Sequence, residues 1–265
     1  MNQKEPRPTM HMNPEQISEF AHALSESAPA TPADAPRRRE PARVISLEAA
    51  GERYWALELE VSDALASTLQ LPAQYTTMRI GEMDARFLVI ASAPGETRWR
   101  FLIDQDSTLG EALEAIDASA LEISVSEAEG RGYVLEEDVR ELVMLTTGSG
   151  LATMCAVLEW AARDRPALLE RASLYYGERR NGDFTSVATE LTRWRQAGVA
   201  IYEVSEDGAT GATRYVQERF ISIMGEEQPR HTTRVLLSGN PLMLRHASAA
   251  LVTRGFAPAQ LSTNV

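Results

Sequence analysis

The chain has few of the features that would place it in a membrane, in a disulfide-bonded fold or at a sulfur-bound metal. Its 265 residues include one cysteine, Cys155, so it can neither form an internal disulfide nor complete an iron–sulfur cluster. No apolar run approaches the roughly 20 residues that span a bilayer. The 38 acidic residues exceed the 26 basic ones, which opposes binding to a nucleic-acid backbone. We therefore expect no metal centre, no membrane span and no nucleic-acid partner.

The N-terminal segment also lacks the apolar core of a signal peptide, so a cytoplasmic location is the default expectation. Its pattern instead predicts a short helix, because Asn13 and Gln16 can close a capping box. Ile17, Phe20 and Leu24 then form one apolar stripe, before a linker rich in proline and alanine. An isolated helix of this length is marginal in water. A frayed tail that is dispensable for folding is the simpler interpretation, and a helix that docks on another surface is the alternative.

The next segment has the composition and the period of β-strands. Hydrophobic residues make up 44% of the chain, which is enough to bury a sizeable core. Six short stretches favour strands, at 43–47, 54–61, 75–80, 85–91, 98–103 and 121–125. One short helix is predicted at 108–116. Short strands separated by glycine and proline are typical of an antiparallel barrel or sandwich.

The second half changes to alternating strands and helices. Compact apolar stretches predict strands at 139–145, 172–176, 199–204 and 233–238. Helices are predicted up to 162 and at 184–196, 215–224 and 241–254. This alternation predicts a doubly wound parallel α/β sheet that is covered on both faces. The predicted fold is an antiparallel β-barrel followed by a doubly wound α/β nucleotide-binding domain. We place the tail at 1–41, the barrel at 42–134 and the α/β domain at 135–265.

Two glycine turns follow strands of the predicted sheet. Residues 147–150, Thr-Gly-Ser-Gly, come directly after its first strand and open its first helix. Ser238 and Gly239 follow the strand at 233–238. Small residues let the backbone approach a pyrophosphate, and a helix N-terminus favours its negative charge. Each glycine could serve only the turn, but two such turns at one sheet edge favour a nucleotide crevice. A side chain at Gly150 should then block nucleotide binding.

In chain order, these segments resemble the ferredoxin–NADP reductase superfamily from about residue 42 to the C-terminus. The segment TGSGLA at 147–152 is similar to the family's nicotinamide loop G-T-G-I-A-P, and YYGER at 175–179 is similar to its strand end on the adenosine side. SGNPLM at 238–243 resembles the C-G-P-x-x-M motif beside the nicotinamide. Upstream, residues 74–75 resemble the Gly-Gln-Tyr strand opening. Residues 86–89 lie where the flavin motif Arg-x-Tyr-Ser would be.

The resemblance implies that the barrel holds FAD or FMN and that the α/β domain holds NAD(P)H. A hydride would pass to the flavin, and electrons would then pass to a separate acceptor. Such a protein is a flavin-dependent NAD(P)H oxidoreductase, whose partner protein could dock through the N-terminal helix. No catalytic residue is assigned. The candidate cofactor-binding residues are Tyr75, Arg86, Val89, Thr147, Gly148, Ser149, Gly150, Arg179, Ser238, Gly239, Pro241 and Met243.

Departures from the family pattern fall mainly on the flavin side. Leu88 replaces the tyrosine that lies on the flavin ring, and Val89 replaces the hydroxyl near its reactive nitrogen. Gly110 falls where the family has a phosphate-binding serine or threonine. Arg86 retains a charge that could pair with a flavin phosphate. We therefore predict weak flavin binding with loss on purification, and we keep a non-catalytic binding or scaffolding subunit as the alternative function.

Several candidates also have a simpler structural explanation. Arg86 could be an exposed strand arginine, and Tyr75 could be ordinary barrel packing. Arg179 and its neighbour Arg180 could be solvated charges, or could select a cofactor with a 2′-phosphate. Ser238 stands where the family has the cysteine that approaches the nicotinamide.

Overall fold

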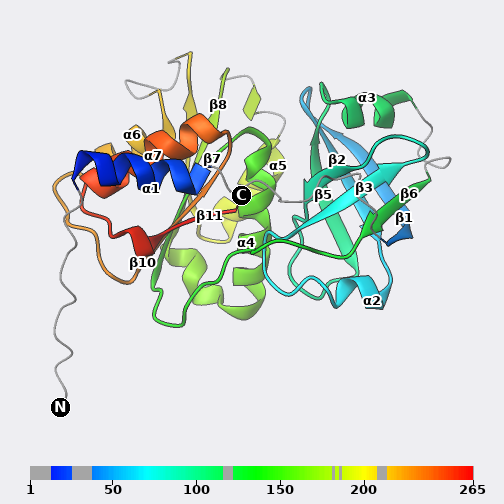
Figure 1. Ribbon diagram of the computed structural model, residues 1–265, viewed down its shortest axis with the longest axis horizontal. Coiled ribbons are helices and arrows are strands. Elements are labelled where there is room, and N and C mark those ends of the chain that lie inside the picture. Colours follow the sequence, from blue (N-terminus) through cyan, green and yellow to red (C-terminus); the bar gives the residue numbers. More distant parts are fainter. Residues whose placement is uncertain are drawn as a thin grey trace.

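The protein, seen in a computed structural model, consists of two bodies that lie side by side (Figure 1). The first is an antiparallel barrel, and the second is a parallel sheet with helices on both faces. The predicted fold class is confirmed. The structure describes residues 13–25, 38–115, 122–180, 183–184, 187–207 and 214–264. Within these ranges no helix has the length and apolar character needed to cross a bilayer.

Six antiparallel strands form the barrel, in the order β4-β3-β6-β1-β2-β5. They are β1 (Arg39–Ala50), β2 (Tyr54–Glu60), β3 (Tyr75–Ile80), β4 (Arg86–Val89), β5 (Arg98–Asp104) and β6 (Ile123–Ser126). Just beyond β4, the Ala91 amide donates to the Arg100 carbonyl oxygen at 2.8 Å, which brings the two edges together and nearly closes the barrel. Two short helices, α2 (Asp63–Ala66) and α3 (Thr108–Ala115), lie at opposite ends of it (Figure 1).

The barrel core follows from the alternation of the strand sequences. Alternate residues of a strand point to the same side. Leu57 and Leu59 of β2 and Trp99, Phe101 and Ile103 of β5 are therefore buried together. This pattern made β2 and β5 recognisable in the sequence.

Five parallel strands form the second sheet, in the order β11-β10-β7-β8-β9. They are β7 (Glu141–Thr147), β8 (Ala172–Glu178), β9 (Ala200–Ser205), β10 (Thr233–Ser238) and β11 (Leu261–Thr263). The chain runs outward from β7 through β8 and β9, then returns to β10 on the other side of β7. A doubly wound sheet binds ligands at this switch point. The strand β11 was not predicted, because three residues carry too little periodic pattern.

Helices cover both faces of this sheet (Figure 1). On one face lie α4 (Leu151–Asp164) and α5 (Ala188–Gln196), and on the other lie α6 (Val216–Met224) and α7 (Pro241–Thr253). The central strand β7 packs against the helices on both faces, because its alternate side chains point to opposite sides. Leu142 and Met144 join the apolar cluster that contains α4 and α5. Val143 and Leu145 join the cluster of α6 and α7.

The N-terminal helix α1 (Pro14–Ser25) packs along α7 on the outer face of the α/β domain (Figure 1). The predicted capping box is present: the Gln16 amide donates to Asn13 Oδ1 at 2.9 Å, and the Asn13 amide donates to Gln16 Oε1 at 3.0 Å. Ala21 is buried, and Phe20 packs against the cluster of α6 and α7. The frayed-tail interpretation is therefore wrong for α1, which docks on its own chain. The predicted linker, 27–41, falls mostly outside the described residues, but its last three residues, 39–41, are not linker and belong to β1.

A shared core and several polar bridges fix the barrel against the α/β domain. Tyr54 and Ala73 from the barrel share an apolar cluster with α4. Arg100 of β5 pairs with Glu159 of α4 at 2.9 Å and also with Glu190, just inside α5. These contacts set the barrel beside the carboxyl edge of the parallel sheet.

Candidate nucleotide-binding site at the domain junction

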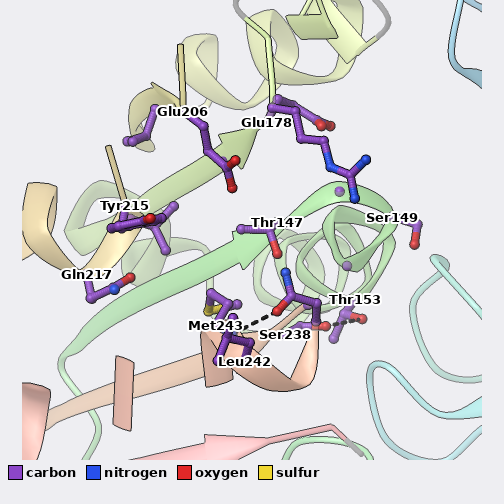
Figure 2. Close-up of a pocket in the computed structure, with 18 of the residues that line it drawn as sticks. Thr147, Ser149, Thr153, Glu178, Glu206, Tyr215, Gln217, Ser238, Leu242 and Met243 are labelled. Carbon is purple, nitrogen blue, oxygen red and sulfur yellow. Dashed lines mark hydrogen bonds between the residues drawn. The ribbon is translucent and has the colours of Figure 1, made fainter. Parts of the chain in front are cut away.

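A cavity of about 550 Å³ lies at the carboxyl edge of the parallel sheet, where the barrel faces it. This size is ordinary for a small-molecule or cofactor site. From the strand ends it is lined by Thr147, Gly177, Val204 and Ser238, and from the barrel by Arg53, Val89 and Asp104. Figure 2 shows Thr147 and Ser238 at the ends of neighbouring strands, with Thr153 beside them. The cavity therefore occupies the switch point of the sheet.

The glycines at these strand ends do two different things. Gly148 has φ of +58°, a left-handed conformation that favours glycine. Leaving its chain neighbours aside, the atoms nearest to a Cβ at this position would be 3.8 Å away. A Cβ on Gly150 would lie 2.7 Å from Thr146 Oγ1 and 3.0 Å from the Ser238 carbonyl oxygen, and one on Gly239 would overlap Thr147 Oγ1. Gly150 and Gly239 thus let β7 and β10 pack together at their ends, whereas Gly148 shapes an open turn.

The first turns of three helices converge on the cavity. Helix α4 follows the 3₁₀ turn Gly148–Gly150, α6 follows Tyr215, and α7 follows Asn240. Asn240 Oδ1 accepts the Met243 amide at 2.8 Å, as drawn in Figure 2, while no described side chain caps α4 or α6. Uncapped helix N-termini carry partial positive charge and free amide donors. The arrangement favours an anionic ligand such as a pyrophosphate.

Gln217, in the first turn of α6, adds an independent sign of a ligand. Its side chain lines the cavity, yet the residue is only 7% exposed. Its Oε1 atom has no hydrogen-bond partner among the described residues. Buried polar atoms are almost always paired in folded proteins. A ligand or water in the cavity would satisfy this one.

Glu178, at the end of β8, is already paired. Its side chain is 1% exposed. Its Oε1 atom accepts hydrogen bonds from the Tyr54 hydroxyl at 3.0 Å and from the Tyr176 hydroxyl, and its Oε2 atom pairs with the Arg53 guanidinium. Burial raises the pKa of Glu178, although the hydroxyls and Arg53 stabilise the carboxylate and oppose that rise. The carboxylate therefore ties the barrel to the sheet and is not available to a ribose hydroxyl.

The positive side chains around the cavity differ in their pairing. Besides Glu178, Arg53 contacts Asp104 at 3.6 Å and Asp183 at 3.5 Å, so its charge is neutralised within the protein. Arg179 and Arg214 also line the cavity and are exposed. Neither forms an ion pair within the part of the chain that the structure describes. The positive charge open to a ligand thus lies on the α/β side.

The predicted cofactor-binding residues divide into two groups. Nine of them line the cavity: Val89, Thr147, Gly148, Ser149, Gly150, Arg179, Ser238, Gly239 and Met243. Tyr75 instead stacks edge-to-face on Phe87, with ring centroids 5.2 Å apart. Arg86 is exposed and donates to the carbonyl oxygen of Ala85 at 3.2 Å. Pro241 forms the first residue of α7 and does not line the cavity.

Sequence reasoning missed the residues that reach the cavity from the barrel and from α6. Arg53 and Asp104 lie in a turn and at a strand end, and neither belongs to a motif. Gln217 lies in the first turn of a predicted helix, which could have been read as a second helix N-terminus at the carboxyl edge of the sheet. Leu88, which stands where the family has the tyrosine on the flavin ring, is partly buried and packs against the barrel core.

Comparison with known proteins gives one family match and a set of structural matches. Residues 144–249 match the family model described as the oxidoreductase NAD-binding domain. No curated protein sequence matches the chain. Solved structures match over both bodies, with low sequence identity.

Three of these structures show the range of the match. A ferredoxin NADP⁺ reductase from Neisseria gonorrhoeae, solved with FAD and NADP, is 17% identical over 86% of this chain and 99% of its own, with a TM-score of 0.66. A cytochrome P450 reductase from Amycolatopsis is 16% identical over 86% of this chain and 70% of its own, with a TM-score of 0.70. The cytochrome b5 reductase domain of Ulva prolifera nitrate reductase is 15% identical over 88% of this chain and 100% of its own, with a TM-score of 0.65. The predicted resemblance is confirmed at the level of the fold.

Proposed function

We propose that this chain, which has the two-domain fold of the ferredoxin–NADP reductase superfamily, is an NAD(P)H-dependent flavin oxidoreductase that supplies electrons to a separate acceptor. One observation carries the proposal: three helix N-termini converge on a cavity that a barrel closes from the opposite side. A dinucleotide needs the first feature, and a redox partner placed against its nicotinamide needs the second.

The α/β residues fit a nicotinamide dinucleotide. The turn at 148–150 and the first turn of α6 offer backbone amides for the pyrophosphate. Arg179 and Arg214 line the cavity, and both are exposed to solvent. The carboxylate of Glu178 is held by the protein, so it does not compete with a 2′-phosphate. Two exposed arginines, Arg179 and Arg214, and one exposed carboxylate, Glu206, line this side of the cavity, so we expect NADPH to bind more tightly than NADH.

The barrel residues fit a flavin only in part. Val89 offers an apolar wall for the ring, and Arg53 and Asp104 line the same cavity. When bound there, a flavin supplies an acceptor for the hydride of the nicotinamide. The cavity lining from the barrel and from the α/β domain would hold the two rings next to each other.

Isothermal titration calorimetry with NADPH tests the nucleotide site directly. Gln217→Glu places a carboxylate among the amides that should hold the pyrophosphate, so we expect NADPH to bind about tenfold more weakly or worse. Gln228→Glu is the matched control, because it adds the same charge in an exposed loop. Equal affinity for NADPH in both variants would show that the nucleotide does not bind at the first turn of α6. Binding of NADPH without any flavin reduction would favour the non-catalytic alternative.

A further inference from the structure

We infer that the flavin is a substrate that binds and leaves, and not a prosthetic group resident in the barrel. This inference rests on the proposed function and concerns the phosphate tail of FMN or FAD. A phosphate is retained by cations or by helix N-termini. The barrel has three candidates beside the cavity or on the edge strand that borders it, namely α3, Arg53 and Arg86. The first two are engaged by the chain itself, and Arg86 does not line the cavity.

The N-terminus of α3 is already satisfied. Ser107 Oγ accepts the Gly110 amide at 3.0 Å and donates to the Asp104 carbonyl oxygen at 2.6 Å. A Cβ on Gly110 would overlap that same carbonyl oxygen, so the first turn lies directly on the end of β5 and leaves no gap. Asp104 and Asp106 add two carboxylates, the first of which accepts the Asp106 amide at 3.0 Å. These charges occupy the positive end of the helix and repel a phosphate.

The arginines of the barrel are no better placed. Arg53 faces the carboxylates of Glu178, Asp104 and Asp183. Turning its guanidinium to a phosphate would weaken the pairing of the buried Glu178, which is costly. Arg86 donates to a neighbouring carbonyl oxygen and does not line the cavity.

Among the described residues that line the cavity, the anion-binding groups left unpaired therefore lie on the α/β side, where the nicotinamide nucleotide takes them. What remains for a flavin is the apolar contact of its ring with the wall at Val89. Ring contact alone does not distinguish riboflavin from FMN or FAD. The reduction balances without a resident cofactor: NAD(P)H gives a hydride to the oxidised ring, one proton comes from solvent, and NAD(P)⁺ and two-electron-reduced flavin dissociate. The reduced flavin then carries the electrons to the separate acceptor.

Flavin titrations of the full chain, followed by quenching of flavin fluorescence, test the inference. We expect dissociation constants for riboflavin, FMN and FAD that agree within about threefold. We also expect extensive dialysis to leave no flavin absorbance. FAD that binds tenfold more tightly than riboflavin, or that survives dialysis in stoichiometric amount, would overturn the inference. Failure of all three flavins to bind would overturn it too.

A variant at the ring wall locates the binding. Val89→Phe should weaken all three flavins by the same factor, because the added ring fills the space beside the barrel wall. Val134→Phe is the matched control, since Val134 is 61% exposed and lies outside the cavity. Unchanged riboflavin affinity in a folded Val89→Phe protein would contradict the inference. Failure of the proposed function is a separate result, because NADPH binding is measured in the absence of flavin.

Discussion

The two halves of the molecule meet at one cavity and treat negative charge in opposite ways. On the α/β side, helices α4 and α6 begin without a side-chain cap in the described residues, and Arg179 is exposed. On the barrel side, the N-terminus of α3 is capped by Ser107, and Arg53 is shared among three carboxylates. One half is prepared for an anion that comes from solution, and the other has filled its anion sites with its own groups.

It follows that the barrel does not need a phosphate site in order to fold. Its stability comes from buried residues such as Trp99 and Phe101, which face inward and do not line the cavity. Leu88, at the position of the family's tyrosine, is partly buried and packs against that core. Positions that face a ligand can therefore change while the barrel persists, so the fold predicts the place of a site better than its ligand.

The largest effect should come from Gly150→Val, which tests whether the α/β half depends on close strand-end packing. The first atom of the new side chain would lie 2.7 Å from Thr146 Oγ1 and 3.0 Å from a backbone oxygen. We expect the free energy of unfolding to fall by about 3 kcal/mol. The substitution therefore destabilises the fold as well as changing the nucleotide site. Denaturant unfolding measures the change. Gly148→Ala is the control and should cost about 1 kcal/mol, because its penalty is conformational only. Equal losses in the two variants would refute the packing role of Gly150.

Removal of residues 1–37 should have the next largest effect and asks how far the α/β half depends on α1. Phe20 and Ala21 pack against the layer of α6 and α7. Losing this contact should cost about 2 kcal/mol and lower the midpoint of thermal unfolding by about 4–8 °C. The affinity for NADPH should not change, since the cavity lies elsewhere. An unchanged midpoint would restore the view that the segment is a dispensable tail.

The sequence predicts the fold well because the two-residue period of strands and the 3.6-residue period of helices recur in regular segments. The predicted strands at 75–80 and 233–238 have the same limits as β3 and β10. Contacts between distant segments are not encoded in this way. Nothing near Asn13–Gln16 says that α1 meets α7, and nothing near Arg53 says that it meets Glu178, 125 residues away. The glycine turns were found because they are local, whereas the barrel wall of the cavity depends on how the two bodies pack.

Arg179→Gln tests whether the exposed positive charge on the α/β side selects NADPH over NADH. We expect the affinity for NADPH to fall about tenfold, because one charge-assisted contact to the 2′-phosphate is lost. The affinity for NADH should stay the same. Arg180→Gln is the matched control, since Arg180 is next in the chain, is exposed, does not line the cavity and contacts Asp183 at 3.6 Å. Calorimetry with both nucleotides measures the ratio. Parallel losses for NADPH and NADH would show that Arg179 does not read the 2′-phosphate.

The smallest expected effect comes from a charge change in the barrel half. The change would make the start of α3 attract a phosphate, as we propose the α/β half does. Asp106 is exposed at the start of α3 and contributes one of the two carboxylates that oppose a phosphate there. Asp106→Arg replaces a repulsive charge with an attractive one at the surface, where such pairs are weak. We therefore expect FAD to gain about threefold in affinity while riboflavin, which has no phosphate, stays unchanged. Glu226→Arg makes the same charge change in an exposed turn of the α/β domain and should alter neither flavin. Fluorescence titration at low ionic strength measures both ligands, and added salt should remove the gain. A gain that is equal for riboflavin and FAD would mean that the phosphate tail does not pass the start of α3.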